Sequence, residues 1–363
     1  MSVTPQIGPH TPTTAVVPSA YETTAAVPSS SPSTVVVPSA YETTAAVPSA
    51  SPSTVAAAAT VPTVAPPAVP PSTVAVPASA APVFRGRIGR DVRSGHYAVP
   101  HRYRLHLSPA CPGCLRVAVT HALLGLEETV PLALLPAVPD TPGSGYAALR
   151  PLYEASAHQY TGPAVAPVLS DGWTGRIVST HAPDILRDLA LRFRAPGRPD
   201  LLPEGREAEI DALGELCERG IDRAAQRAGE LGLDEATAHR GPLDELLATL
   251  GGLERRLGRQ AYVLGDGLTA ADVHVWVSLV QLDTVHRRHL DAGALHRIAG
   301  HTALWSYARR LAARPAFARH LDIDGIAARH RAHCGGREAA GAAMGVVDWA
   351  AYGREGRDGR RAD

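Results

Sequence analysis

The stretch Tyr103-Arg-Leu-His-Leu-Ser-Pro-Ala-Cys-Pro-Gly-Cys-Leu-Arg116 decides the fold of this chain. Residues 103–108 have the apolar, alternating pattern of a strand, and the run from Arg116 to Leu126 has that of a helix. Cys111 and Cys114 therefore lie in a turn between a strand and a helix. The first cysteine of such a turn faces unpaired helix amides and the positive end of the helix dipole, which stabilise a thiolate. We predict that Cys111 is a reactive nucleophile.

The same cysteine spacing also occurs in half of a zinc site. The other half is missing, because Cys217 and Cys334 stand alone and no second Cys-x-x-Cys exists. We therefore expect no metal site. Four cysteines in 363 residues do not make a disulfide scaffold, so the sequence indicates a reducing, cytoplasmic setting. Cys114 lies one helical turn further in, where it is either a resolving thiol or a packed apolar residue.

The first part of the chain, residues 1–84, is predicted to be a disordered tail. Glu22 and Glu42 are its only charged side chains, and the segment Val16–Ser29 returns unchanged at Val36–Ser49. Frequent prolines prevent helix formation, and the segment has too few large apolar side chains to build a core. The alternative is an extended stalk or a segment that docks a partner.

Charge and apolar runs bear on two kinds of partner, nucleic acids and membranes. Lysine plus arginine and aspartate plus glutamate both number 35, so the formal net charge is zero and gives no electrostatic argument for nucleic acid binding. The chain has no run of about twenty apolar residues that would predict a membrane span, and its start lacks the pattern of a signal peptide. We expect neither a nucleic acid nor a membrane as partner.

Residues 85–195 are predicted to form a thioredoxin-like domain. After the cysteine turn and its helix, the sequence pattern predicts a strand at 129–135, a short helix at 147–157, strands at 165–169 and 176–179, and a helix at 182–193. This order, strand–helix–strand followed by strand–strand–helix, predicts a mixed sheet covered by helices.

Residues 205–333 are predicted to form an all-helical domain, because leucines recur there at helical spacing and no strand pattern stands out. Thr269 and Asp272 have the spacing of a capping box at the start of one of these helices. Residues 334–363 are predicted to be a flexible tail, within which Trp349 packs locally. The fold class is thus α/β followed by all-α.

Several segments, in the same order from about residue 84 to about 333, resemble the glutathionyl-hydroquinone reductases, the Xi class of the glutathione transferase superfamily. They are Ser108–Arg116, Leu152-Tyr-Glu with Tyr160-Thr-Gly162, Ala166-Pro-Val-Leu169, Ile177-Val-Ser179, Tyr262-Val-Leu-Gly265 with Leu268–Val273, Leu282-Asp-Thr-Val285 and Leu304–Arg309.

The resemblance implies a thiol-dependent transferase or reductase. In that family a cysteine thiolate attacks a glutathionylated hydroquinone and forms a mixed disulfide, which a second glutathione resolves. Carried over by motif, Cys111 is the nucleophile and Cys114 a possible resolving thiol. Pro167 matches a cis proline, and the backbone of Ala166 is the expected contact of the thiol cofactor. Partners are then a small-molecule thiol and a quinone-type or other electrophilic substrate, and a homodimer is possible.

The loop that follows the last strand departs from the family. Ser179 and Thr180 remain candidates for binding the thiol cofactor. The Glu-Ser pair that holds the γ-glutamyl group in the family is replaced by His181 and Ala182, which removes a charge-assisted hydrogen bond to an ammonium group. The cofactor is therefore glutathione or another low-molecular-weight thiol, such as mycothiol.

Other family positions are altered too. A tryptophan of the turn is replaced by Gly113, and two tyrosines that contact the hydroquinone are replaced by Asp222 and His286. Arg116 is retained, where it either favours the thiolate or lies on the helix surface. His320, His330 and His333 are interpreted as solvated.

Two further functions stay open. The chain could be a degenerate, non-enzymatic member of the superfamily that has lost its cofactor, with the repeat tail docking a partner. Alternatively, Cys111 and Cys114 could cycle between a dithiol and a disulfide, as in a dithiol–disulfide oxidoreductase.

Overall fold

The computed structural model describes residues 84–141, 143–231, 240–333 and 345–352. All of them lie in one compact unit, Ala75–Asp363. The predicted tail at 1–84 lies outside the described residues except for Phe84. No helix among the described residues is both long and apolar enough to span a membrane.

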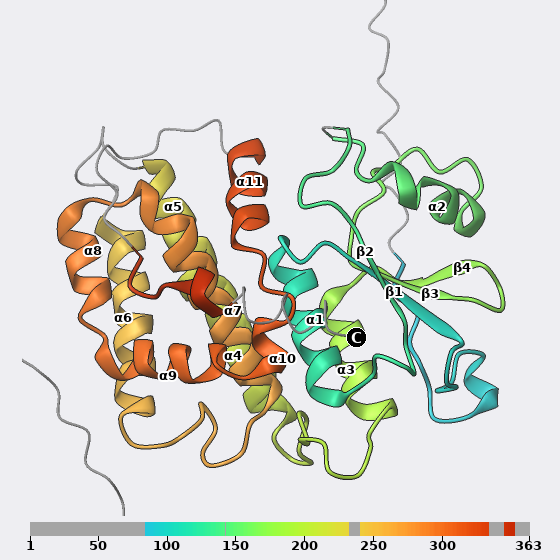
Figure 1. The fold of residues 1–363 in the computed structure, drawn as a ribbon, viewed down its shortest axis with the longest axis horizontal. Helices are drawn as coiled ribbons and strands as arrows, with labels where there is room; N and C mark the ends of the chain where they lie inside the picture. Colours follow the sequence, from blue (N-terminus) through green and yellow to red (C-terminus); the bar gives the residue numbers. More distant parts are fainter. Residues whose placement is uncertain (1–83, 142, 232–239, 334–344, 353–363) are drawn as a thin grey trace, which may run out of the picture. The chain divides into compact units, whose positions relative to one another are not determined.

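The first half of the described chain forms a four-stranded mixed sheet with helices on both faces (Figure 1). The strands lie in the order β2-β1-β3-β4; β1 pairs in parallel with β2 and antiparallel with β3, and β3 pairs antiparallel with β4. The elements are η1 (Val92–Ser94), β1 (Tyr103–Leu107), α1 (Pro112–Leu124), β2 (Leu132–Leu134), η2 (Ala147–Leu149), α2 (Arg150–Ser156), β3 (Val168–Asp171), β4 (Arg176–Ser179) and α3 (Ala182–Arg192). The predicted thioredoxin-like topology is confirmed.

Three of these elements differ from the predicted bounds. Helix α1 begins at Pro112 rather than near Arg116, because proline has the φ of a first helical turn and lacks the amide that would be unpaired there. Strand β2 spans only Leu132–Leu134. Strand β3 begins directly after Pro167, because the proline ring nitrogen cannot donate a hydrogen bond to a sheet. It ends at Asp171 rather than at residue 169.

The two faces of the sheet belong to different cores. On β1, Tyr103, Leu105 and Leu107 are buried in the main core together with residues of α1 and α3. Val168 of β3 lies in a second, smaller core with Tyr153 of α2 on the opposite face. Figure 1 shows α1 and α3 between the sheet and the helical half, and α2 on the far side of the sheet.

The second half of the described chain is all helical, as predicted. Its elements are α4 (Glu207–Cys217), the π-helix η3 (Glu218–Arg223), α5 (Ala224–Leu231), α6 (Arg240–Leu257), α7 (Ala270–Thr284), η4 (His286–His289), α8 (Ala292–Ala299), α9 (Thr302–Ala312), α10 (Pro315–Ala318) and α11 (Ile323–His333). Helix α7 is buried along almost its whole length and forms the centre of this half.

Asp272 holds the start of α7. Both halves of the predicted capping box are present, which confirms that prediction. Its carboxylate accepts hydrogen bonds from the amides of Thr269 and Val263, both at 2.8 Å, and from the hydroxyl of Tyr307, also at 2.8 Å. The Thr269 hydroxyl adds a fourth at 3.2 Å. One buried carboxylate therefore joins the start of α7, the loop before it and α9.

Asp283, near the end of α7, anchors residues 345–352. Its carboxylate accepts hydrogen bonds from the amides of Val346 and Val347 and from the indole of Trp349, at 2.9 to 3.0 Å. Trp349 is buried and its ring meets that of Trp276 edge to face. These residues therefore pack on α7, in line with the local packing predicted for Trp349. The rest of the tail predicted for 334–363 lies outside the described residues.

Candidate active site

Cys111 is the N-cap residue of α1, directly before the helix begins at Pro112. Its own amide donates to the Ser108 carbonyl at 2.8 Å, which closes the turn after β1. Its side chain is half-buried and not part of a disulfide. A β-carbon added to Gly113 would lie 4.0 Å from the Cys111 sulfur and 3.4 Å from the β-carbon of Ala182, so the turn and the start of α3 lie side by side.

The surroundings of Cys111 favour its thiolate. A hydrogen bond from the Cys114 side chain is the largest cause that lowers the pKa of Cys111, to about 6. The amides of Cys114 and Gly113 and the charge of Arg329 act in the same direction, whereas burial opposes them. The thiolate is therefore present above about pH 6 and is lost as the pH falls through that value.

The other described cysteines are poor nucleophiles. Cys114 is buried in the first turn of α1, and burial raises its pKa well above the usual range. Cys217 is fully buried in α4, and burial raises its pKa to about 12. Cys334 lies outside the described residues. Among the described cysteines the arrangement thus favours Cys111 as the attacking sulfur, with Cys114 as its hydrogen-bond donor.

Arg329 is a site residue that the sequence did not indicate. It lies on α11, and its guanidinium donates hydrogen bonds to the Ala137 carbonyl at 3.2 Å and to the Tyr146 hydroxyl at 3.0 Å. Its charge stabilises the thiolate of Cys111, which begins a helix in the other half of the chain. In an arginine-rich chain, with Arg331 two positions away on the same helix, no sequence signal distinguishes this arginine.

Replacing Arg329 should make Cys111 less acidic. In Arg329→Gln the loss of a nearby positive charge should raise the pKa of Cys111, and alkylation of Cys111 near pH 6 should slow about threefold to tenfold. The rate of iodoacetamide labelling of Cys111 against pH, followed by peptide mass mapping, measures this. Arg331→Gln removes an exposed arginine from the same helix and is the matched control. Equal pH profiles for the two variants would contradict this role for Arg329.

The segment before β3 has the predicted cis peptide bond between Ala166 and Pro167. Pro167 is buried and Ala166 is half-buried. Within the part of the chain that the structure describes, neither the amide nor the carbonyl of Ala166 forms a hydrogen bond. Both groups are therefore free to pair with an extended peptide ligand, in the way that an added strand pairs with a sheet edge.

The loop between β4 and α3 is held from within. Ser179 is fully buried, and its hydroxyl accepts a hydrogen bond from the His181 amide at 3.1 Å. The amide of Thr180 donates to the Phe84 carbonyl at 3.0 Å. The side chain of Ser179 thus shapes the loop, while that of Thr180 is half-buried.

His181, the N-cap residue of α3, belongs to a charged cluster. Its Nδ1 lies 3.0 Å from a carboxylate oxygen of Asp184 and 3.1 Å from the Arg85 guanidinium, which also donates to Asp184 at 2.8 Å. Arg87 contacts the other Asp184 oxygen at 3.5 Å. The Asp184 carboxylate therefore lies one helical turn after His181, the position where the family has glutamate. The guanidinium groups of Arg85 and Arg87 partly neutralise its charge.

The prediction that Arg116 lies on the helix surface is wrong. Its side chain is 14% exposed and donates hydrogen bonds to Asp222 at 2.9 Å and to the Ser278 hydroxyl at 3.0 Å. Asp222 lies in the π-helix η3, where burial raises its pKa and the charge of Arg116 opposes that effect. The three residues join α1 to the helical half. The charge that stabilises Cys111 comes from Arg329, not from Arg116.

The prediction that His320 and His330 are solvated is also wrong. His320 is buried, and His330 on α11 is half-buried with its Nε2 2.7 Å from Nε2 of His289 in η4. The ring of His286 lies 6.3 Å from that of His330, and burial lowers the pKa of His286 to about 4. His286, His289 and His330 thus meet between η4 and α11, and His330 directly follows Arg329 in the sequence.

Comparison with known sequences finds relatives of this chain. A sequence model of the family described as glutathione S-transferase, C-terminal domain, matches residues 235–322. Glutathionyl-hydroquinone reductase PcpF of Sphingobium chlorophenolicum is 30% identical over 237 residues, which cover 60% of this chain and 74% of the relative. Glutathionyl-hydroquinone reductase YqjG of Escherichia coli (strain K12) is 28% identical over 262 residues, which cover 66% and 78%.

Solved structures of glutathione transferases are also similar to this chain. A glutathione transferase from Gordonia bronchialis superposes with a TM-score of 0.61 at 28% identity, covering 69% of this chain and 82% of that chain. The glutathione-bound structure of YqjG from Escherichia coli K-12, described as a glutathione transferase homologue, superposes with a TM-score of 0.59 at 26% identity, covering 68% and 87%. The thioredoxin-like half and the helical half therefore occur together in these proteins as they do here.

Proposed function

Because the chain belongs to the glutathionyl-hydroquinone reductases, a family of glutathione-dependent enzymes, we propose that it reduces glutathionylated quinone-type substrates through a mixed disulfide on Cys111. The observation that carries this proposal is the half-buried Cys111 at the start of α1, whose pKa is lowered to about 6 by Cys114, two helix amides and Arg329. At neutral pH such a cysteine is mainly thiolate, the form that attacks sulfur.

The reaction has two steps. The Cys111 thiolate attacks the sulfur that joins glutathione to the ring of the hydroquinone; a Cys111–glutathione disulfide forms and the carbon–sulfur bond breaks. The ring carbon keeps the electron pair of that bond and takes up a proton, which gives the free hydroquinone. The thiolate of a second glutathione then attacks the mixed disulfide, releases Cys111 as thiolate and leaves as glutathione disulfide.

The thiol cofactor in this proposal is glutathione. Its cysteinyl backbone would pair with the unpaired amide and carbonyl of Ala166, beside Pro167, and its γ-glutamyl group would lie over the loop at Ser179 and Thr180. Arg85 and Asp184 there offer one charge of each sign, which suits a group that carries both a carboxylate and an ammonium. Mycothiol, which the altered loop also allows, has no support from the relatives. A homodimer and a cytoplasmic setting belong to the same proposal.

A second candidate function rests on Cys114. Because Cys114 donates a hydrogen bond to the sulfur of Cys111, the two sulfurs are in contact, and an internal disulfide could form after Cys111 has been modified. The buried side chain with a raised pKa favours the monothiol route, since a resolving thiol must itself ionise.

Intact-mass analysis of the full chain separates these routes. After incubation with glutathione disulfide we expect one glutathione on Cys111 in both the wild type and Cys114→Ser, which keeps a hydroxyl donor to Cys111 but loses the second sulfur. Turnover of a glutathionylated hydroquinone should persist in that variant. An adduct seen only in Cys114→Ser, with an oxidised and unadducted wild type, would establish dithiol cycling instead. An adduct formed only from mycothiol disulfide would overturn glutathione as the cofactor.

A further inference from the structure

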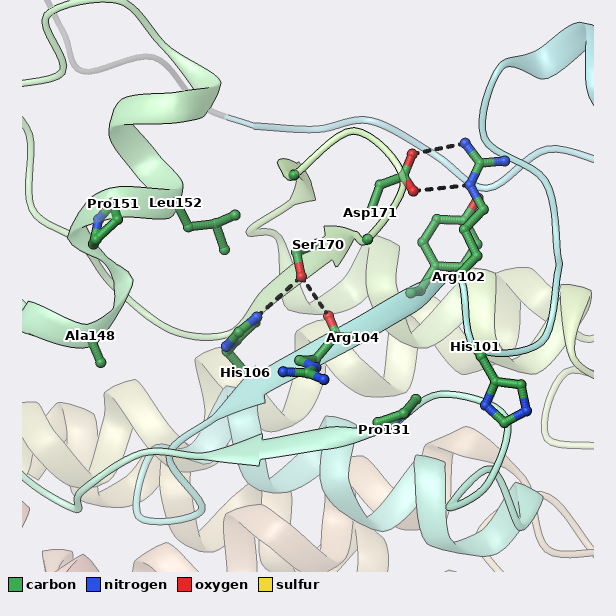
Figure 2. A pocket seen from close by; sticks show the side chains of 13 residues that line it. His101, Arg102, Arg104, His106, Pro131, Ala148, Pro151, Leu152, Ser170 and Asp171 are labelled. Atoms are coloured by element: carbon green, nitrogen blue, oxygen red, sulfur yellow. Dashed lines mark hydrogen bonds and ion pairs between the residues drawn. The ribbon is translucent and has the colours of Figure 1, made fainter.

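A hollow of about 470 Å³ lies on the face of the sheet that α2 covers, opposite to the face that packs on α1 and α3 (Figure 2). One wall is polar and consists of β1 and β3, with Arg104, His106 and Ser170. The opposite wall is apolar and comes from η2 and α2, where Figure 2 shows Pro151 and Leu152 facing the strands. The remaining lining residues are His101, Arg102, Tyr103, Pro131, Ala148, Asp171, Gly172 and Gly175.

The strand register places these polar side chains together. Arg104 lies opposite Ser170, and His106 lies opposite Val168, in the antiparallel pair of β1 and β3. Opposite residues share a face of the sheet, and so do residues two apart on one strand. Arg104, His106 and Ser170 therefore lie on the same face of the sheet. Along β1, the positions of Arg104 and His106 are about 7 Å apart.

The hollow carries an uncompensated positive charge. Arg102 and Asp171 at one end form a two-pronged ion pair, with bonds of 2.8 and 3.1 Å, and neutralise each other. Asp171 is the only carboxylate among the lining residues. Within the described parts of the chain, the exposed guanidinium of Arg104 has no hydrogen bond or ion pair. An anionic group of a ligand would therefore be attracted to Arg104.

His106 offers a hydrogen-bond acceptor beside this charge. The Ser170 hydroxyl donates to the Arg104 carbonyl at 3.3 Å, because a carbonyl can only accept. Ser170 must then accept from Nε2 of His106, 3.1 Å away, which assigns the proton of the neutral ring to Nε2 and leaves Nδ1 as an acceptor. Burial, followed by the charge of Arg104, lowers the pKa of His106 and so keeps the ring neutral.

We propose that this hollow binds a hydroxylated aromatic carboxylate. Its carboxylate would pair with Arg104, its hydroxyl would donate to Nδ1 of His106, and its ring would pack on Pro151 and Leu152. The carboxylate and the hydroxyl of the ligand would pair with the Arg104 guanidinium and Nδ1 of His106, two groups that no other group in the described structure contacts, and its ring would extend the apolar packing of Leu152. The site is separate from the thiol chemistry proposed for Cys111, because it lies on the opposite face of the sheet.

Calorimetric titration of the full chain with 4-hydroxybenzoate tests this proposal. We expect saturable binding that weakens at least tenfold in Arg104→Gln and is unchanged in Arg93→Gln, which removes an equally exposed arginine from η1. The uncharged analogue 4-hydroxybenzamide should bind the wild type at least tenfold more weakly than the acid. Benzoate, which lacks the hydroxyl, should bind less tightly than 4-hydroxybenzoate.

The outcomes separate this site from the thiol site. Arg104→Gln is expected to keep the wild-type rate of mixed-disulfide formation at Cys111 while it loses 4-hydroxybenzoate binding. The proposal is overturned if no binding is detected at millimolar ligand, if Arg104→Gln and Arg93→Gln bind alike, or if acid and amide bind equally. Displacement of 4-hydroxybenzoate by glutathione would also overturn it, because the ligand would then occupy the thiol site.

Discussion

Cys111→Ser is expected to lower turnover of a glutathionylated hydroquinone by at least about 10³-fold. A serine hydroxyl stays protonated near neutral pH, where the groups around Cys111 hold the cysteine mainly as thiolate. Serine also cannot form the sulfur–sulfur bond of the mixed disulfide. Steady-state kinetics with glutathione as the second substrate measures the loss, and intact mass should show no glutathione adduct on the variant.

Cys217→Ala is the matched control for this loss. Cys217 is fully buried in α4 and burial raises its pKa to about 12, so it has no part in thiol chemistry at neutral pH. Its loss should leave turnover within a small factor of the wild type. If Cys111→Ser kept full activity, or if both variants lost it equally, the assignment of Cys111 as the nucleophile would be wrong.

Asp272→Ala is expected to lower the free energy of unfolding by about 3–5 kcal/mol. The substitution removes the acceptor for the buried amides of Val263 and Thr269 and for the hydroxyl of Tyr307. Each of these donors would then be buried without a partner, and the N-terminal cap of α7 would be lost as well. Urea unfolding followed by circular dichroism measures the change.

Asp266→Ala provides the control for this prediction. Asp266 is exposed in the loop before α7, so its removal should change the free energy of unfolding by no more than about 0.5 kcal/mol. Asp272→Asn, which keeps one carbonyl acceptor, should fall between the two alanine variants. A loss below about 1 kcal/mol in Asp272→Ala would show that the buried donors find other partners.

Local sequence patterns were sufficient for much of the fold. The cysteine turn, the cis proline at Pro167 and the capping box of Asp272 each depend on residues close together in the chain, and each occurs in the structure as predicted. Strand ends were less well predicted: β3 begins three residues later than its apolar run, because Pro167 cannot donate a hydrogen bond to the sheet. Apolar composition alone does not show where backbone pairing begins.

The candidate site was only partly predictable, because some of its residues come from segments that are distant in the sequence. Cys111 and Ala166 follow from motifs, whereas Arg329 lies more than two hundred residues beyond Cys111, in a helix that also contains Arg331. Arg116 shows the opposite error: its charge suggests a position on the helix surface, but Asp222 and Ser278 from the helical half accept its hydrogen bonds. Side chains whose partners come from distant segments have no signature in their own local sequence.

The sequence by itself determined that Cys111 lies in a turn between a strand and a helix, and with it the thioredoxin-like order of elements and the helical second half. These features come from local patterns: alternating or helical periodicity, a cysteine pair between two such runs, and a capping residue three positions away. Only the tertiary structure decided which charge faces the sulfur, how deeply Cys114 is buried, and that Arg104 lines a hollow without a partner among the described residues. Electrostatics and burial depend on distances in space between residues that are far apart in the chain, and a thiolate responds to those distances alone.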